Sequence, residues 1–305
     1  MDQAHFLLAL LFFLTIGHLV TLKLCSVKLD HRTAPLFISI WTLLGAAAVS
    51  PHYGHLWIKG WDKFVEAPWL LALVTVKGLA LCYLFVVSQQ LMKVSLSSRH
   101  YVTPLAVGLI TVSNSFFGEK LKFHEMFAGL GLCALAAAFF FKGHLSSLDR
   151  PSRIAYAKLV LLSTLLSTTD LVLTKATNWY ALVILTYAVV FVVACIWNFR
   201  APENFKAALF HRSAAMAGVL YAATELVKFY QQVEINPVSV VVTVQAMTKP
   251  VILVLSALIW KERTVREQLV WGLAAFVITL PLFIPQDVLE QLLPFLKEDG
   301  VVSAP

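Results

Sequence analysis

The chain has 305 residues, of which 59% are hydrophobic and only 13% are charged, and its mean hydropathy is +0.78. This composition supplies too few charged side chains to cover a water-soluble globule of this size, which excludes an ordinary soluble protein. The formal net charge of +7 comes from Lys and Arg residues that stand singly or in pairs between apolar runs, without the basic stripe of a nucleic-acid-binding surface.

Ten apolar runs follow one another along the chain, each near the roughly 20 residues that cross a bilayer as a helix. In chain order they are 4–23, 34–50, 67–92, 97–117, 123–142, 155–177, 179–199, 208–232, 236–260 and 266–285. The connections are too short to hold a soluble catalytic domain. The predicted fold is an all-α membrane protein with ten transmembrane helices and a C-terminal tail at 287–305. The first run lacks the basic flank and cleavage site of a signal peptide, so we expect it to stay in the mature protein.

An internal repeat relates the two halves of the chain. Residues 117–141 superimpose without gaps on 260–284, which matches Glu119 with Glu262 and Gly129 with Gly272. The first apolar run aligns with the sixth in the same way. Each half then holds five spans, and an odd number of spans makes the second copy enter the membrane from the opposite face. The sequence therefore predicts inverted repeats at 1–145 and 146–286, an arrangement in which substrate sites lie near the midplane between the halves.

The distribution of basic residues predicts an orientation in the membrane. Lys and Arg gather in the odd-numbered connections, as at Lys28, Arg32, Arg150 and Arg153. By the positive-inside rule these connections are cytoplasmic and both chain ends lie outside.

Several ionisable residues fall inside the apolar runs, where each costs at least about 2.5–3.5 kcal/mol to insert unless it faces a cavity or a partner. Lys249 lies halfway along the ninth run, one turn after Gln245, so both project from one helix face. We interpret them as an anion-binding pair that lines a substrate pathway; the alternative is a lysine paired with a neighbouring carboxylate. Lys77, in the third run, is a further substrate-binding candidate, although its long side chain could also reach the membrane interface.

The eighth run carries a polar stripe. Its members are Tyr221, Glu225, Lys228 and Gln232, whose spacing places them on one face of a helix. A polar face of this kind must contact protein or water. Tyr221, Glu225 and Lys228 are therefore candidates for substrate binding. Glu225 and Lys228 could instead pair with each other in a structural role, or Glu225 could exchange protons and release Lys228 when substrate arrives.

The first and sixth runs place ionisable groups at matching positions. His18 aligns with Asp170, which shares a helix face with Ser163, Ser167 and Thr174. Under inverted symmetry the two could lie at comparable depths, so they are candidates for a proton relay. The alternative for His18 is a contact between helices.

Two prolines lie within the equivalent fourth and ninth runs, Pro104 and Pro250. A proline inside a helix removes a backbone hydrogen bond and kinks the helix. Interrupted helices at matching positions of two halves point to a transporter site, so both prolines are candidates for gating. Simple curvature of the helices is the alternative.

These motifs resemble those of the drug/metabolite transporter superfamily. The resemblance covers essentially the whole chain and rests on Gly118-Glu119-Lys120-Leu121, on the helix that starts near His124 and contains Gly129, and on the echo at Lys261-Glu262-Arg263-Thr264 and Gly272. It implies ten helices around a central cavity, alternating access, and cytoplasmic chain ends, opposite to the charge count above. Gln245 to Pro250 is similar to the triose-phosphate and nucleotide-sugar branch, in which a lysine of this helix meets the substrate's phosphate. Here Pro250 stands where that branch often has a basic residue.

The function predicted from these residues is secondary transport of a small polar metabolite across a membrane. Lys77, Lys228 and Lys249 outnumber Asp170 and Glu225, which favours an anion: an organophosphate, a nucleotide-sugar or a carboxylate, moved by exchange or proton coupling. The alternatives are an amino-acid or amine exporter of the same fold, and a flippase for lipid-linked intermediates or a membrane-embedded enzyme. The sequence contains no HExxH, GxSxG or Walker motif, so no catalytic residue is assigned.

The remaining expectations concern partners and location. The four cysteines lie far apart and no histidine stands at ligand spacing, so we expect no cofactor and no metal. The expected partners are a small-molecule substrate and membrane lipids, with no nucleic acid, and the protein is expected to be a monomer or homodimer. The short connections are typical of a bacterial inner membrane protein; a Golgi or other organelle membrane is the alternative.

Overall fold

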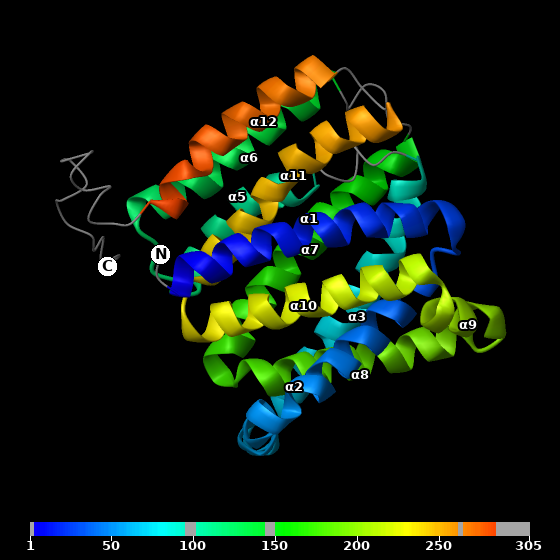
Figure 1. Ribbon diagram of the computed structural model, residues 1–305. Helices are drawn as coiled ribbons and strands as arrows, with labels where there is room; N and C mark the ends of the chain where they lie inside the picture. Colours follow the sequence, from blue (N-terminus) through cyan, green and yellow to red (C-terminus); the bar gives the residue numbers. More distant parts are fainter. Residues whose placement is uncertain (1–2, 95–101, 144–149, 262–264, 285–305) are drawn as a thin grey trace.

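The computed structural model describes residues 3–94, 102–143, 150–261 and 265–284 (Figure 1). Within these ranges the chain is helical and contains no β-strand. Six of the described helices are long and apolar enough to cross a bilayer: α1 (Gln3–Lys28), α2 (Thr33–Glu66), α3 (Pro68–Val94), α7 (Arg150–Ala176), α8 (Trp179–Asn198) and α11 (Val238–Trp260). The prediction of an all-α integral membrane protein is confirmed at this level.

The other predicted spans coincide with further helices. Three are apolar and border residues outside the described ranges: α5 (Val102–Phe116), α6 (Phe123–Gly143) and α12 (Val265–Thr279), the last followed by the 3-10 turn η2 (Leu280–Phe283). The predicted span 208–232 is divided at His211 between the short helix α9 (Pro202–Phe210) and α10 (Arg212–Glu234). The C-terminal tail at 287–305 and Glu262 lie outside the described residues.

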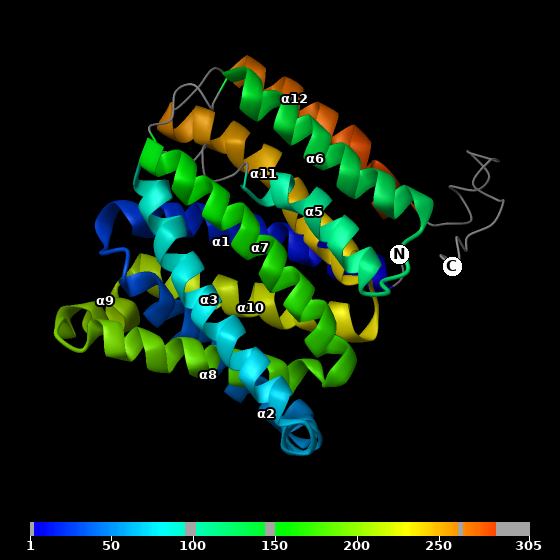
Figure 2. The ribbon, with the colours of Figure 1, turned by 180° about the vertical axis from the view of Figure 1, so that it is seen from behind.

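The helices form two groups. In Figures 1 and 2, α5, α6, α11 and α12 lie together on one side, α2, α3, α8 and α10 lie on the other, and α1 and α7 run between them. Each group has its own apolar core. The main contacts join α1 to α10, α2 to α8, α2 to α10, α5 to α6, α11 to α12, α5 to α7, α3 to α7, α3 to α8 and α1 to α11.

Helix α2 extends further than the sequence predicts. The expected span 34–50 ends at Pro51, but the helix continues through that proline to Glu66 and has 34 residues, about 51 Å at 1.5 Å per residue. Bonds from α8 hold the two sides of the proline: the Tyr180 hydroxyl donates to the Ala46 carbonyl (2.9 Å), and the Asn178 amide donates to the Leu56 carbonyl (2.8 Å). These contacts with the start of α8 thus keep α2 helical beyond Pro51, where the local sequence favours an end of the helix.

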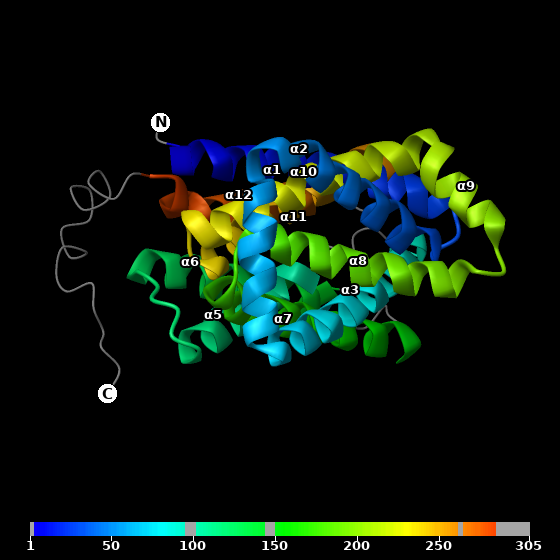
Figure 3. The same ribbon diagram turned by 90° about the horizontal axis from the view of Figure 1, so that it is seen from below.

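The end of α2 lies across the other helices. It is seen nearly end-on at the bottom of Figure 1 and runs across the bundle in Figure 3. Its Trp57 and Trp61 rings stack with centroids 5.8 Å apart, and an exposed ion pair joins Lys63 to Glu66. Tryptophans and lysines in this arrangement are typical of the membrane interface.

Many large apolar side chains point outward from the helices. Phe127 on α6, Leu161 on α7 and Leu273 on α12 each expose more than half of their surface. A soluble protein rarely leaves so many large apolar side chains in water, and a hydrocarbon surrounding removes this cost. The exposed apolar side chains therefore agree with the membrane protein that the composition predicts.

The two prolines proposed for gating have different positions. Pro250 lies inside α11, as predicted, and the Cβ of an alanine at Gly272 of α12 would lie 3.5 Å from its Cβ. Pro104 lies in α5, whose described part begins at Val102. The residues before it, 95–101, lie outside the described ranges, so the matching interruption of this helix stays a prediction.

Candidate functional site

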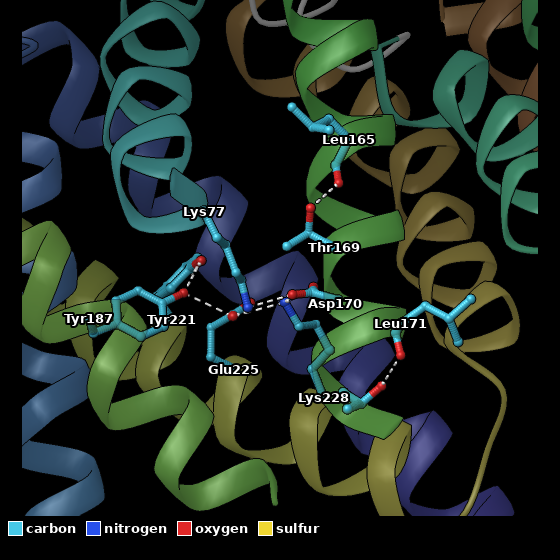
Figure 4. Close-up of polar contacts among 10 residues, drawn as sticks. Lys77, Leu165, Thr169, Asp170, Leu171, Tyr187, Tyr221, Glu225 and Lys228 are labelled. Atoms are coloured by element: carbon cyan, nitrogen blue, oxygen red, sulfur yellow. Dashed lines mark hydrogen bonds and ion pairs between the residues drawn. The ribbon is translucent and has the colours of Figure 1, made fainter. Parts of the chain in front are cut away.

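Four ionisable side chains meet in the interior between α3, α7 and α10 (Figure 4). Asp170 of α7 forms an ion pair with Lys77 of α3, and its other carboxylate oxygen lies 3.8 Å from Lys228 Nζ of α10. Lys228 Nζ also donates to Glu225 Oε2 of the same helix, at 2.9 Å. Lys77, Asp170 and Glu225 are buried, and the Lys228 side chain is 13% exposed. We call Lys77, Asp170, Glu225 and Lys228 the central cluster.

Two tyrosine hydroxyls extend the central cluster toward α8. The Tyr187 hydroxyl of α8 donates to Glu225 Oε2 at 2.8 Å, and it lies 2.7 Å from the Tyr221 hydroxyl of α10. A hydroxyl has one proton to donate. Because Tyr187 uses its hydroxyl proton in the hydrogen bond to Glu225, Tyr221 must be the donor in the hydrogen bond to Tyr187. The two hydrogen bonds therefore both point toward the Glu225 carboxylate.

His18 of α1 joins this group through Tyr221. The two rings meet edge to face with centroids 4.7 Å apart. The His18 Nδ1 atom lies 3.1 Å from the Ala217 carbonyl oxygen, which can only accept, so Nδ1 carries the proton. The sequence predicted a relay between His18 and Asp170; the described contacts link them through Tyr221, Tyr187, Glu225 and Lys228.

An aromatic ring and a glycine position the lysines. Lys77 Nζ and Lys228 Nζ lie 4.4 and 4.3 Å from the centroid of Phe229, close enough for cation–π attraction. Gly78, next to Lys77, faces Val189 of α8, and a Cβ at this position would come within 2.6 Å of that side chain. The missing Cβ lets α3 approach α8 and brings Lys77 to the cluster.

Other predicted substrate-binding residues lie on a different helix. Lys249 is buried on α11, and Gln245 lies one turn earlier. The contacts that join the central cluster run through α3, α7, α8 and α10. That cluster holds two ammonium groups and two carboxylates and is formally neutral, so the excess positive charge counted from the sequence depends on Lys249.

The Glu119 of the Gly-Glu-Lys-Leu motif has a structural partner. Its carboxylate accepts bonds from the backbone N–H of Ser239 (3.1 Å) and from the Ser239 hydroxyl, at the start of α11. Asn114 also donates to that hydroxyl (3.2 Å), and Lys175 at the end of α7 donates to the Phe117 carbonyl (2.9 Å) just after α5. We call Asn114, Glu119, Lys175 and Ser239 the Glu119 clamp. It caps two helix ends, because a carboxylate suits a helix N-terminus and a cation suits a C-terminus.

Sequence reasoning missed Tyr187 and Phe229. Tyr187 stands in an apolar run beside Thr186, and its hydroxyl is the one signal that could have marked it. Phe229 is indistinguishable in sequence from any core aromatic. Among the described residues, no three His, Cys, Asp or Glu side chains gather as metal ligands would.

Comparison with known proteins adds no identification. No protein-family model matches the chain, and no curated protein matches it. The interpretation of the site therefore depends on its geometry and on the sequence itself.

Proposed function

We propose that this protein is a secondary transporter that moves a small polar metabolite across a membrane by alternating access. The observation that carries the proposal is the central cluster: four ionisable side chains, three of them buried, contributed by three helices of an apolar bundle. Buried ion pairs contribute little net stability, because their desolvation offsets much of their attraction. Ionisable groups among membrane helices are instead typical of substrate and ion pathways.

The helix packing supports an inverted repeat. Of the long described helices, the first proposed half (1–145) contains α1, α2, α3, α5 and α6, and the second (146–286) contains α7, α8, α10, α11 and α12 besides the short α9 and η2. Exchanging the halves turns packed pairs into other packed pairs: α1 with α10 becomes α7 with α3, α2 with α10 becomes α8 with α3, and α5 with α6 becomes α11 with α12. We therefore propose ten spans, with the central cluster between the two halves.

One detail of the packing repeats across the halves. Gly78 lets α3 approach α8 closely, and Gly218 lets α10 approach Trp41 of α2 in the equivalent pair of helices. This correspondence favours the drug/metabolite transporter architecture that the motifs resemble.

For the substrate we propose an anion, because Lys77 and Lys228 are the groups that could pair with it and Lys249 adds a further buried positive charge. The protein is proposed to act without a catalytic step, and a bacterial inner membrane is the proposed location. A flippase or a membrane-embedded enzyme is the competing function.

The direct test is a thermal-shift screen of detergent-solubilised protein against organophosphates, nucleotide-sugars, carboxylates, amino acids and amines, followed by uptake of each hit into proteoliposomes. A ligand that binds the native state raises the midpoint of unfolding by mass action. We expect at least one class to bind and to be taken up, and Asp170→Asn protein to lose uptake. Chemical turnover of a lipid substrate by purified protein without any gradient would show the enzyme instead.

A further inference from the structure

The charge balance of the central cluster restricts what it can bind. Lys77 and Lys228 compensate Asp170 and Glu225, and the three most buried of these side chains are 9% exposed or less. A net charge in such surroundings is strongly unfavourable. A ligand that brings a single negative charge must therefore enter with a compensating positive charge.

The two ammonium groups are arranged to receive an anion. Both lie over the ring of Phe229, at 4.4 and 4.3 Å from its centroid, and both pair with the single carboxylate of Asp170. Lys228 is the more exposed of the two lysines. Lys228 also pairs with Glu225 at 2.9 Å, and an anion that enters between the two ammonium groups can take the place of that carboxylate.

Glu225 is the carboxylate equipped to take up a proton. When it is ionised, the bonds run from Tyr221 through Tyr187 to Glu225 Oε2. When it is protonated, its own O–H can donate to Tyr187, and Tyr187 can turn to donate to Tyr221. Rotation of the Tyr187 hydroxyl thus lets it donate to the ionised carboxylate or accept from the protonated one, which reverses the bond between them. The contacts described for Asp170 are with the two lysines, which offer it no such reversal.

We infer that the protein loads a monoanion together with one proton, with the anion on Lys228 and Lys77 and the proton on Glu225. The inference rests on the proposed transport function and specifies its substrate class and its coupling. The anion displaces Glu225 from the Lys228 ammonium, one proton from the solution protonates the freed carboxylate, and both leave together on the other side. Loading adds no net charge, and transport is electroneutral.

The groups around Glu225 define the controls. Tyr187 faces it from α8, Tyr221 and Lys228 from α10, Asp170 and Lys77 lie beyond Lys228, and His18 faces Tyr221 from α1. Imidazole is the group that ordinarily titrates near neutral pH. A His18→Gln variant therefore separates a pH dependence of His18 from one of Glu225.

The experiment measures binding of two permanent monoanions, lactate and dimethyl phosphate, to the full-length protein in detergent between about pH 5 and 8. If one proton is taken up with each anion, the Kd of the wild-type protein rises by about tenfold per pH unit where Glu225 is ionised in the free protein. Glu225→Gln, which carries the neutral amide permanently, should bind the same anion with no pH dependence. The matched surface control Glu66→Gln should keep the wild-type slope, and a slope that His18→Gln loses and Glu225→Gln keeps would assign the proton to His18 and overturn the inference.

A second measurement uses wild-type protein alone. Uptake of the bound anion into proteoliposomes should be unchanged by an imposed membrane potential and accelerated by an inwardly directed proton gradient. Potential-driven uptake, a flat wild-type Kd, or a full slope in Glu225→Gln would each overturn the inference. Binding of alanine or ethylammonium in place of both anions would overturn it too, while leaving the transporter proposal intact. If no anion, zwitterion or cation binds or enters vesicles, the proposed function itself is wrong.

Discussion

The central cluster and the Glu119 clamp both bury a carboxylate, yet they satisfy it in different ways. Glu119 accepts bonds from the backbone and side chain of Ser239 at the start of α11, and Lys175 caps the neighbouring end of α5. These partners are fixed parts of helix ends. Glu225 and Asp170 are satisfied by lysine and tyrosine side chains, which can rotate away.

This difference separates a structural carboxylate from an exchangeable one. A backbone N–H at a helix terminus has no other partner within its helix, so the bond to Glu119 stabilises the fold and offers nothing to a ligand. A lysine that pairs with a carboxylate can pair with another anion of the same charge. Glu119, which belongs to the motif that resembles a family signature, thus holds helix ends together. The candidate site is the central cluster, to which the polar stripe contributes Glu225 and Lys228.

The largest expected effect comes from Asp170→Asn, which leaves Lys77 and Lys228 with one carboxylate between them. Removing one partner of a buried ion pair costs about 3–5 kcal/mol, because the other charge stays buried without compensation. Thermal unfolding in detergent should show this loss, whereas Asp62→Asn on the exposed face of α2 should change little. The double variant Asp170→Asn with Lys77→Met restores the charge balance and should recover part of the loss; full additivity would contradict the pairing.

An intermediate effect is expected from Glu119→Ala, which removes the cap of α11. Leaving the Ser239 N–H without its acceptor should lower the free energy of unfolding by about 1–3 kcal/mol. Glu119→Gln should restore part of this, since an amide oxygen can still accept. Neither variant should alter the pH dependence of anion binding, and a changed pH slope would mean that the clamp belongs to the transport site.

The smallest effect on stability is expected from removing either of two buried tyrosine hydroxyls on α8, which should differ in their effect on transport. Tyr187→Phe removes the donor to Glu225, and Tyr180→Phe removes a donor to the Ala46 carbonyl of α2. Tyr180→Phe loses this one hydrogen bond and about 1 kcal/mol of stability, whereas Tyr187→Phe loses its bonds to Glu225 and to Tyr221 and about twice as much. Transport measured against pH should change in Tyr187→Phe alone, because of these two hydroxyls only that of Tyr187 contacts Glu225 and can accept a hydrogen bond from its protonated carboxyl. Equal transport changes in both variants would remove Tyr187 from the mechanism.

The polar stripe on α10 shows which features of the candidate site could be predicted from the sequence. Its spacing predicts that Tyr221, Glu225 and Lys228 share one helix face, and in the structure Lys228 contacts Glu225 while Tyr187 contacts both Tyr221 and Glu225. Lys77 and Asp170 were each found because an ionisable residue in an apolar run is conspicuous. Their pairing could not be predicted, since it depends on how α3 and α7 are rotated about their axes.

Helix boundaries show a second limit. The end of α2 was expected at Pro51 because a proline opposes helix continuation, but contacts with α8 extend the helix to Glu66. In the same way, the role of Glu119 was invisible because its partner Ser239 is 120 residues away. Local preference cannot report a bond that only the packed helices create.

The sequence by itself determined the solvent and the class of this protein. Its apolar runs have the length of spanning helices and its interior charges are too costly to be accidental, and both facts follow from the insertion free energies of single residues. The tertiary structure alone decided which charges meet. It joined Lys77 to Asp170, placed Tyr187 beside Glu225 and made the cluster neutral, because these contacts are set by the relative rotation and close approach of helices that are far apart in the chain.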